Sequence, residues 1–545
     1  MNEIMNRETF NNAPQIEIQR SKMTRHYNHK TTLNVGDLVP VYIEQLVLPG
    51  DTFKINASAV ARLTTPLFPT MDNCFGDIYF FAVPYRLVFD KWEELNGENK
   101  EGAWAQDVEY EVPHFTTTET AVKEGGFHDH AGIATKVKGI DFSKLPRRAY
   151  ELIYNEWFRD QNVIEPVKID KGVGDSQLKD TDDNLFKVCK LHDYFTSALP
   201  GAQKGDPVSL PLSGNAPIIT TNNELAMTST GELKWRFSDG GLPGSKGGDE
   251  GSHIFGLNVN TNGSTGHSGS VAESFFSGLH PTNLQADMSE IVATTINQLR
   301  LAFQTQRILE KDARGGTRYT EIIKQHFNVE SPDARLQRPE YLGSKRFTID
   351  FQQIAQTSAS DQQSPQGHMT AFSLSGVETD DITKSFTEHS IIMGLMVIRT
   401  QQTYQQGVAK AWSKRTRFDY YLPALANIGE QPILKREIYA QGNAVDKEVF
   451  GYQEAWAEYR MKPNEISGKF RSNADGTLDA WHYAQNLTGA PVISKEFLEQ
   501  QPTEMDRTIT VNHNITDQFI VDFATDEELY RPMPLYSVPG MIDHF

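Results

Sequence analysis

Alternating apolar and polar positions predict β-strands over almost the whole chain. Residues 38–63 place apolar side chains at alternate positions before and after a Pro-Gly-Asp turn at 49–51, which predicts two tightly joined strands. Residues 76–92 are β-branched and aromatic throughout, so they predict a strand that is buried on both faces and limited in length by Pro84. Further strands are expected within residues 345–354, 390–400 and 508–523. Strands this far apart indicate a common β core from which long insertions extend.

A helical period replaces the alternation in residues 283–312. Apolar side chains recur there at steps of three and four residues, at Met288, Val292, Ile296, Leu299 and Phe303. This spacing predicts an amphipathic helix, and residues 319–327 give a second, shorter apolar stripe. Between the two, Gly315-Gly316 has neither a preceding strand nor the Lys-Ser/Thr pair of a phosphate-binding loop, so we interpret it as the joint where one helix ends.

Two segments lack hydrophobic periodicity. Residues 18–32 carry four basic side chains and no acidic one, which predicts an extended basic arm. This arm is either a solvated tail or a local patch for nucleic acid or for a neighbouring subunit. Residues 240–270 hold ten of the chain's 40 glycines and predict a surface loop. A loop of this length is either a mobile linker or a projection with a binding role.

Composition and charge narrow the classes of function. Among the 545 residues, 71 acidic against 52 basic side chains give a net charge of −19, so any contact with nucleic acid must be local. The two cysteines, Cys74 and Cys189, are too few for a disulfide framework and favour a reducing compartment. No apolar stretch approaches the roughly 20 residues that span a bilayer, and no apolar signal segment is found, so we expect neither membrane insertion nor classical export.

Candidate chemistry is sparse. His128 and His130 lack a third ligand at zinc spacing, and the acidic run at 180–185 has Leu185 where a calcium loop needs glycine. The motifs of serine hydrolases, zinc proteases and dinucleotide-binding folds are missing, so we predict no enzyme, no cofactor and no metal. Aromatic and basic residues interleave in residues 413–421, SKRTRFDYY. That pattern suits either base stacking with phosphate contacts or packing at an interface.

Several long stretches carry a more specific pattern. They include YFFAVPYRLVFDKWEELNGE, LPRRAYELIYNEWFRDQN, TYQQGVAKAWSKRTRFDYYLPALANIGEQ, FGYQEAWAEYRMKPNEISGKFRS and RPMPLYSVPGMIDHF. Together these stretches resemble the major capsid proteins of the gokushoviruses, small single-stranded DNA bacteriophages of the Microviridae. The resemblance runs from about residue 20 to Phe545 and leaves out the glycine-rich region.

The resemblance implies a fold and a function. The fold would be mainly β, an eight-stranded antiparallel jelly roll with large loop and helical insertions. Sixty copies would form a T=1 icosahedral shell around a circular single-stranded DNA genome, in a virion assembled in the bacterial host cytoplasm. A small basic DNA-binding virion protein would neutralise the packaged genome, which an acidic shell cannot do. A surface projection would bind a receptor on the host surface. A monomeric β-sandwich glycan-binding module or a hydrolase is the alternative.

These expectations divide the chain and assign candidate residues. The basic arm covers residues 1–32, and a single capsid domain covers 33–545, with a variable projection at about 213–281, a helical insertion at 283–330 and an extended C-terminal arm at 525–545. The candidates for contact with DNA are Arg20, Lys22, Arg25, Lys30, Lys414, Arg415 and Arg417. Those of the host-attachment projection are Gly240, Lys246, His253, Phe255, Asn262 and His267. Those of the inter-subunit arm are Tyr530, Pro532, Tyr536 and Phe545.

Overall fold

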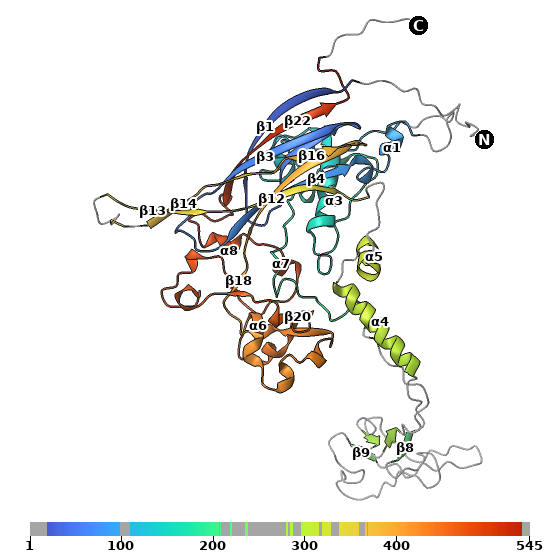
Figure 1. The fold of residues 1–545 in the computed structure, drawn as a ribbon, viewed down its shortest axis with the longest axis vertical. Coiled ribbons are helices and arrows are strands. Elements are labelled where there is room, and N and C mark those ends of the chain that lie inside the picture. The colour runs from blue at the N-terminus through green and yellow to red at the C-terminus, as the bar shows by residue number, and fades with distance from the viewer. Residues whose placement is uncertain are drawn as a thin grey trace, which may run out of the picture. The chain divides into compact units, whose positions relative to one another are not determined.

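Figure 1 shows the fold of the chain in a computed structural model. The structure describes residues 19–98, 109–206, 208, 218–220, 235–237, 279–281, 284–286, 296–314, 319–328, 337–358, 366–367 and 369–536. The chain divides into two compact units. Unit 1 combines Met1–Lys204 with Glu310–Phe545, and unit 2 is Gly205–Leu309.

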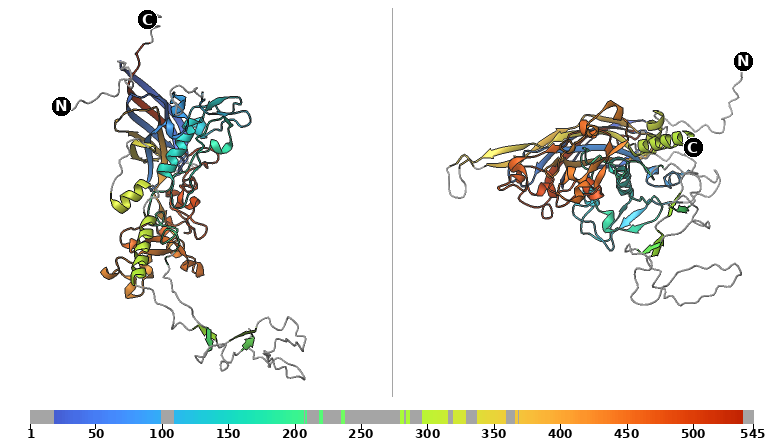
Figure 2. Two further views of the ribbon diagram at one scale, coloured as in Figure 1. Left: turned by 90° about the vertical axis from the view of Figure 1, so that its right-hand side faces the viewer. Right: turned by 90° about the horizontal axis from the view of Figure 1, so that it is seen from below.

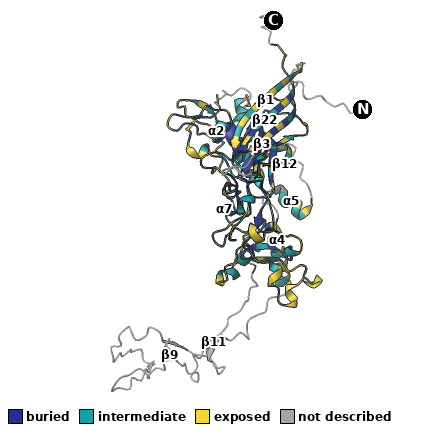
Figure 3. Cartoon of the chain, turned by 90° about the vertical axis from the view of Figure 1, so that its left-hand side faces the viewer, coloured by how far each residue is buried: buried dark blue, intermediate teal, exposed yellow. Residues whose placement is uncertain are grey.

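Sheet 1 of unit 1 joins strands from the two ends of the described chain. Its strands are β1 (Ser21–Leu33), β3 (Thr52–Leu63), β15 (Ser375–Glu378), β16 (Ile382–Ser385) and β22 (Phe519–Arg531). Their order is β1-β22-β3-β15, β16 also pairs with β3, and every pair is antiparallel. Buried and exposed side chains alternate along β3 and β22, as the alternating colours of Figure 3 show. One face of sheet 1 therefore belongs to a core, and the other face is open.

The two central strands of sheet 2 are buried on both faces. Sheet 2 contains β2 (Val39–Val47), β4 (Cys74–Pro84), β12 (Glu340–Thr348) and β17 (Ser390–Thr400), in the antiparallel order β12-β4-β17-β2. Almost every residue of β4 and β17 is buried, which confirms the doubly buried strand that the sequence predicted up to Pro84. The predicted turn between β2 and β3 is also present, and its Gly50 has a φ of +90°, a conformation that suits glycine.

Two hydrophobic cores hold the sheets in place. The first lies between them, with Phe53 and Phe523 from sheet 1 and Phe80 and Ile392 from sheet 2 among its members. The second covers the outer face of sheet 2, where α3 (Leu145–Ile153) and the π-helical turn η2 (Tyr154–Phe158) pack against β4 and β17. Because both sheets are antiparallel and share a core, the structure confirms a mainly β sandwich that carries insertions.

The insertions contain short elements. Between β4 and β12, unit 1 holds η1 (Tyr85–Leu87), α1 (Trp92–Leu95), β5 (His114–Thr116), α2 (Phe127–His130), β6 (Asp141–Ser143), β7 (Ser176–Gln177) and η3 (Asp180–Asp182). Unit 2 contains two antiparallel pairs, β8 (Ile218–Thr220) with β11 (Leu284–Ala286) and β9 (Trp235–Phe237) with β10 (Leu279–Pro281). Two helices follow, α4 (Ile296–Arg314) and α5 (Tyr319–Phe327). The hairpin of β13 (Phe351–Ala355) and β14 (Met369–Ser373) extends away from the sandwich in Figures 1 and 2.

The insertion between β17 and β22 is the richest in short elements. Its first half holds β18 (Thr403–Tyr404), η5 (Lys410–Ser413), η6 (Arg417–Asp419), η7 (Pro423–Leu425), β19 (Glu430–Leu434), α6 (Lys435–Ile438), η8 (Ala444–Lys447) and β20 (Val449–Glu454). Its second half holds η9 (Ala457–Tyr459), β21 (Asn464–Glu465), η10 (Gly468–Phe470), η11 (Asp479–Trp481), α7 (Lys495–Leu498) and α8 (Thr503–Asp506). A third core, which includes Phe195, Ile433, Phe450 and Leu498, joins this insertion to residues that precede unit 2.

Several predicted boundaries differ from the structure. Residues 21–32 of the predicted arm belong to strand β1, and residues 525–531 of the predicted C-terminal arm belong to β22, because the two segments pair with each other. The strand predicted within 345–354 is broken between β12 and β13, and the one predicted from residue 508 begins only at Phe519. Leu284–Ala286 forms strand β11, not the start of the predicted helix. The Gly315-Gly316 joint lies outside the described residues.

Candidate assembly and nucleic-acid interfaces

The open face of sheet 1 carries a ladder of opposite charges. Lys22 Nζ lies 2.9 Å from Glu528 on the neighbouring strand, and the hydrogen bond that Lys22 donates to this carboxylate raises the pKa of Lys22. On β3, Lys54 makes a similar pair with Asp381 at 2.9 Å. Antiparallel pairing sets these contacts, since every second residue of β1 and β22 points to the same face. The basic residues of β1 are thus matched by acidic residues of β22.

The four predicted DNA contacts of this region differ in their surroundings. Arg25 points inward and donates to Glu527 Oε2 at 2.5 Å and to Glu44 of β2, so it links the two sheets. Arg20 donates to Thr52 Oγ1 at 2.8 Å and to the carbonyl oxygen of Tyr530 at 3.1 Å. Lys22 is paired as described above. Lys30 is 76% exposed and 4.0 Å from its nearest carboxylate, that of Asp522, so it is the least engaged of the four.

The second predicted basic cluster lies in the insertion between β17 and β22. Lys414 Nζ donates to Glu458 Oε1 at 2.9 Å and lies 4.2 Å from the centre of the Tyr459 ring. Although partial burial favours the neutral amine, the hydrogen bonds to Glu458 and Tyr459 raise the pKa of Lys414. Its side chain is only 6% exposed, so it is part of the local packing. Arg415 and Arg417 are exposed, and the Arg417 guanidinium lies 4.7 Å from the Phe418 ring centre.

Exposed aromatic rings surround this cluster. The most exposed members are Trp412 at 85%, Phe418 at 59%, Tyr459 at 56% and Tyr420 at 52%. A group of exposed rings is unusual on a chain that works alone, and it marks a surface for a partner. The same group is suited to stacking with bases when guanidinium groups lie beside it.

The described end of the C-terminal segment leaves the body of unit 1. Tyr530 is the exposed penultimate residue of β22, while Arg531 is anchored to Asp51 Oδ2 at 3.0 Å. Beyond Pro532, Leu535 is 54% exposed and Tyr536 is 79% exposed, although both are apolar or aromatic. The predicted arm residue Phe545 lies outside the described residues, as do the projection candidates Gly240, Lys246, His253, Phe255, Asn262 and His267.

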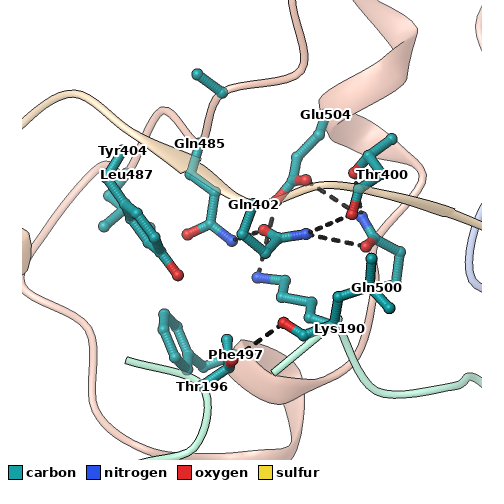
Figure 4. A network of polar contacts seen from close by, with 12 residues as sticks. Lys190, Thr196, Thr400, Gln402, Tyr404, Gln485, Leu487, Phe497, Gln500 and Glu504 are labelled. Atoms are coloured by element: carbon teal, nitrogen blue, oxygen red, sulfur yellow. Dashed lines mark hydrogen bonds and ion pairs between the residues drawn. The ribbon is translucent and has the colours of Figure 1, made fainter. Parts of the chain in front are cut away.

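A buried network of amides holds the insertion between β17 and β22 against the rest of unit 1 (Figure 4). Gln402 Nε2 donates to Gln500 Oε1 at 3.0 Å, and Gln485 Nε2 donates to Gln402 Oε1 at 2.8 Å. Beside them Lys190 lies 3.8 Å from Glu504. Burial lowers the pKa of Lys190 and raises that of Glu504, because it disfavours both charged forms, and the charge of each partner offsets only part of this effect. The network spans segments about 300 residues apart in sequence and serves to fix them together.

An aromatic groove on the outer side of sheet 2 was not predicted from the sequence. It consists of two adjoining cavities of about 480 and 280 Å³ that share Trp157, Phe158, Cys189 and His192. Further aromatic walls come from Tyr79, Phe81 and Tyr341. Arg346 and Arg399 also line it and both donate to Asp77. Burial alone would raise the pKa of Asp77, but these two arginines lower it.

Across the part of the chain that the structure describes, no group of three or more His, Cys, Asp and Glu side chains could hold a metal ion. In the same residues no helix has the length and apolar character needed to cross a membrane. His128 Nδ1 donates to Asp183 Oδ1 at 2.9 Å and is buried with it, so His128 belongs to the packing of the insertion between β4 and β12.

Comparison with known proteins decides the family. The sequence profile of the family described as capsid protein (F protein) matches residues 11–541. The chain belongs to this capsid protein family. Three curated capsid proteins, each called capsid protein VP1, are similar over almost their full length. That of Bdellovibrio phage phiMH2K is 43% identical and covers 99% of each chain, and that of Chlamydia phage 1 is 38% identical and covers 98% of this chain and 97% of its own. That of Spiroplasma virus 4 is 39% identical and covers 96% of both.

Membership of the capsid protein family confirms the resemblance to gokushovirus capsid proteins. It also confirms that the chain is a structural component of a virion and not an enzyme. A capsid protein acts as one of many copies, so its function resides in surfaces and not in a reacting group. The ion ladder, the exposed aromatic rings and the aromatic groove are the surfaces with which this capsid protein is equipped.

Proposed function

We propose that the chain is the major capsid protein of a T=1 shell, in which 60 copies enclose a circular single-stranded DNA genome. The observation that carries the proposal is the order of strands in the two sheets. Counted along the chain, sheet 1 takes the first, third, sixth and eighth strands, with β15 and β16 together as the sixth, and sheet 2 takes the second, fourth, fifth and seventh. This alternation is the connectivity of a jelly roll, the sandwich from which many viral shells are built.

Closed shells need large obligate contacts between copies. Each such contact commonly buries about 2,000 Å² or more. The long insertions and the exposed aromatic rings around Trp412 offer such an area, as do the apolar residues that follow Pro532. The variable region at about 213–281, with its candidate residues, would form the projection that meets a receptor on the bacterial host.

The first prediction concerns the C-terminal segment. We expect that a chain that stops after Pro532 folds but does not close shells, because the strand β22 is complete while the exposed apolar residues 533–536 are lost. The measurement is electron microscopy of the full and the shortened chain, with circular dichroism to check folding. Normal shells from the shortened chain would refute the role of the segment.

Contact with DNA is assigned to the most accessible basic residues. Lys30, Arg415 and Arg417 project into solvent, whereas Arg25 and Lys414 are engaged with carboxylates. Three local cations cannot neutralise a genome in a shell whose subunits each carry a net charge of −19, so we also propose a small basic companion protein. Assembly in the host cytoplasm is proposed from the resemblance to gokushovirus capsid proteins.

The second prediction tests these contacts. Shells made with Lys30→Gln, Arg415→Gln and Arg417→Gln together should retain less DNA, and the retained DNA should be released at lower salt, because phosphate contacts are lost. The ratio of absorbance at 260 and 280 nm of purified shells over a salt series measures this. If DNA content and its salt dependence stay the same, these residues do not meet the genome.

A further inference from the structure

The aromatic groove takes no part in the contacts proposed above. Its two most accessible aromatic rings are Trp157 of η2 and Tyr341 of β12, which are 41% and 43% exposed. Phe81, which lies beside them, is buried. The two adjoining cavities, of about 480 and 280 Å³, have the size and the apolar walls of a site for a ring and a short stretch of chain.

The positive charge of the groove is concentrated at one place. Arg346 and Arg399 both line the larger cavity and share the single carboxylate of Asp77. One positive charge is therefore in excess where these two guanidinium groups meet. A single excess cation fits one carboxylate better than the closely spaced phosphates of a nucleic acid.

A segment of this chain has the matching chemistry. Nine residues, 537–545, follow the last described residue, Tyr536, and end in the sequence Met541-Ile542-Asp543-His544-Phe545. This sequence offers one carboxylate side chain, on Asp543, and one apolar ring, on Phe545, two positions apart. The described residues before it, Leu535 and Tyr536, are exposed and largely apolar, so no other described residue covers them.

The geometry of the sandwich favours a second copy as the source of this segment. It follows β22 of sheet 1, whereas the groove is on the face of sheet 2 that is turned away from sheet 1. We propose that the aromatic groove binds the segment 537–545 of a neighbouring copy, with the Phe545 ring among Trp157, Phe158 and Tyr341 and the Asp543 carboxylate beside Arg346. This inference rests on the proposed role of the C-terminal segment in assembly, and it names the place where that segment binds.

Peptide binding tests the inference without any need for shells. The probe is a fluorescent peptide of residues 533–545, amidated at its C-terminus so that Asp543 carries its only carboxylate, titrated by fluorescence anisotropy into the full-length chain kept as free subunits. We expect saturable binding that weakens at least about tenfold when the peptide carries Phe545→Ala or Asp543→Asn, because a buried ring or a charge pair is lost. These peptide variants leave the folding of the protein unchanged.

Variants of the protein locate the binding site. Trp157→Leu should weaken binding of the peptide at least about tenfold, whereas Trp412→Leu, which removes a more exposed ring outside the groove, should leave binding unchanged. No saturable binding, equal binding of all three peptides, or equal binding to Trp157→Leu would overturn the inference. Displacement of the peptide by oligothymidylate would also overturn it and assign the groove to nucleic acid. If shells need residues 533–545 while the peptide fails to bind, only this inference fails and the proposed function stands.

Discussion

His482 is held as a neutral ring by its neighbours. Its Nε2 lies 2.7 Å from the carbonyl oxygen of Phe470 and must donate a proton to it, while Nδ1 accepts from the backbone N–H of Ala484 at 3.1 Å. The Arg507 guanidinium is 3.3 Å from Nδ1. A second proton, on Nδ1, would prevent this atom from accepting the N–H of Ala484 and would place a positive charge beside the Arg507 guanidinium. Burial first, and the charge of Arg507 as a weaker cause, lower the pKa of His482, against a carbonyl contact that raises it.

The third prediction follows from the direction of this shift. Because the folded ring has a pKa below 6.5, the unfolded chain binds the proton first, and the free energy of unfolding should fall as the pH drops through about 6.5 toward the folded pKa. Urea unfolding of free subunits at pH 7.5 and 5.5 measures this. His482→Gln should reduce the loss, and His26→Gln, at an exposed ring, should not. An unchanged loss in His482→Gln would assign the effect to another group, such as His130, whose pKa burial also lowers.

Strand β1 shows how far the sequence could predict an element. Its extended conformation and its basic charge were expected, because Lys22, Arg25 and Lys30 and the lack of an apolar period are visible in the sequence itself. Its membership of sheet 1 was not, because the matching acids Asp522, Asp526, Glu527 and Glu528 are about 500 residues away. Charge read locally suggested free cations, whereas strand pairing places an acidic neighbour beside most of them.

Other elements divide in the same way. The doubly buried β4 and the β2–β3 turn were predicted because burial and turn chemistry are local in sequence. The aromatic groove was missed because its walls come from β4, η2, β12 and β17 and no short motif contains them. A local indication of the groove is the dense aromatic content of residues 154–158, but these residues also belong to a stretch that carries the family resemblance.

The fourth prediction tests β1 as a structural strand. Arg25→Gln should lower the free energy of unfolding by about 1–2 kcal/mol, because Glu527, with a side chain only 1% exposed, loses its cation. The figure stays at the low end since 38% of the Arg25 side chain is in water. Lys22→Gln breaks an exposed pair and should leave unfolding unchanged within error. Equal effects of the two substitutions in urea would contradict the inward position of Arg25.

The whole molecule is strongly acidic, and this bears on how copies meet. Each copy carries a net charge of −19, so free subunits repel one another at long range. Dissolved salt screens this repulsion over about 10 Å at 0.1 M, whereas contacts between apolar surfaces such as Trp412 or Tyr536 do not weaken.

The fifth prediction is therefore that assembly becomes faster and more complete as salt rises from about 10 to 150 mM, over which the Debye length falls from roughly 30 to 8 Å. Light scattering of purified subunits, followed by electron microscopy, measures it. Weaker assembly at the higher salt would mean that ion pairs between copies, and not apolar contacts, dominate the interfaces.

The pairing of β1 with β22 also affects how the chain is made. Ser21 lies opposite Arg531 in sheet 1, a sequence separation of 510 residues. A ribosome adds about 5–20 residues each second, so β1 waits about 25–100 s for its partner strand. Contacts between residues so far apart in sequence also slow folding, because a long loop must close before they form. Until β22 emerges, the edges of β1 and β3 that later pair with it stay unpaired in the nascent chain. We therefore expect chaperones to cover these edges while the chain is still being synthesised.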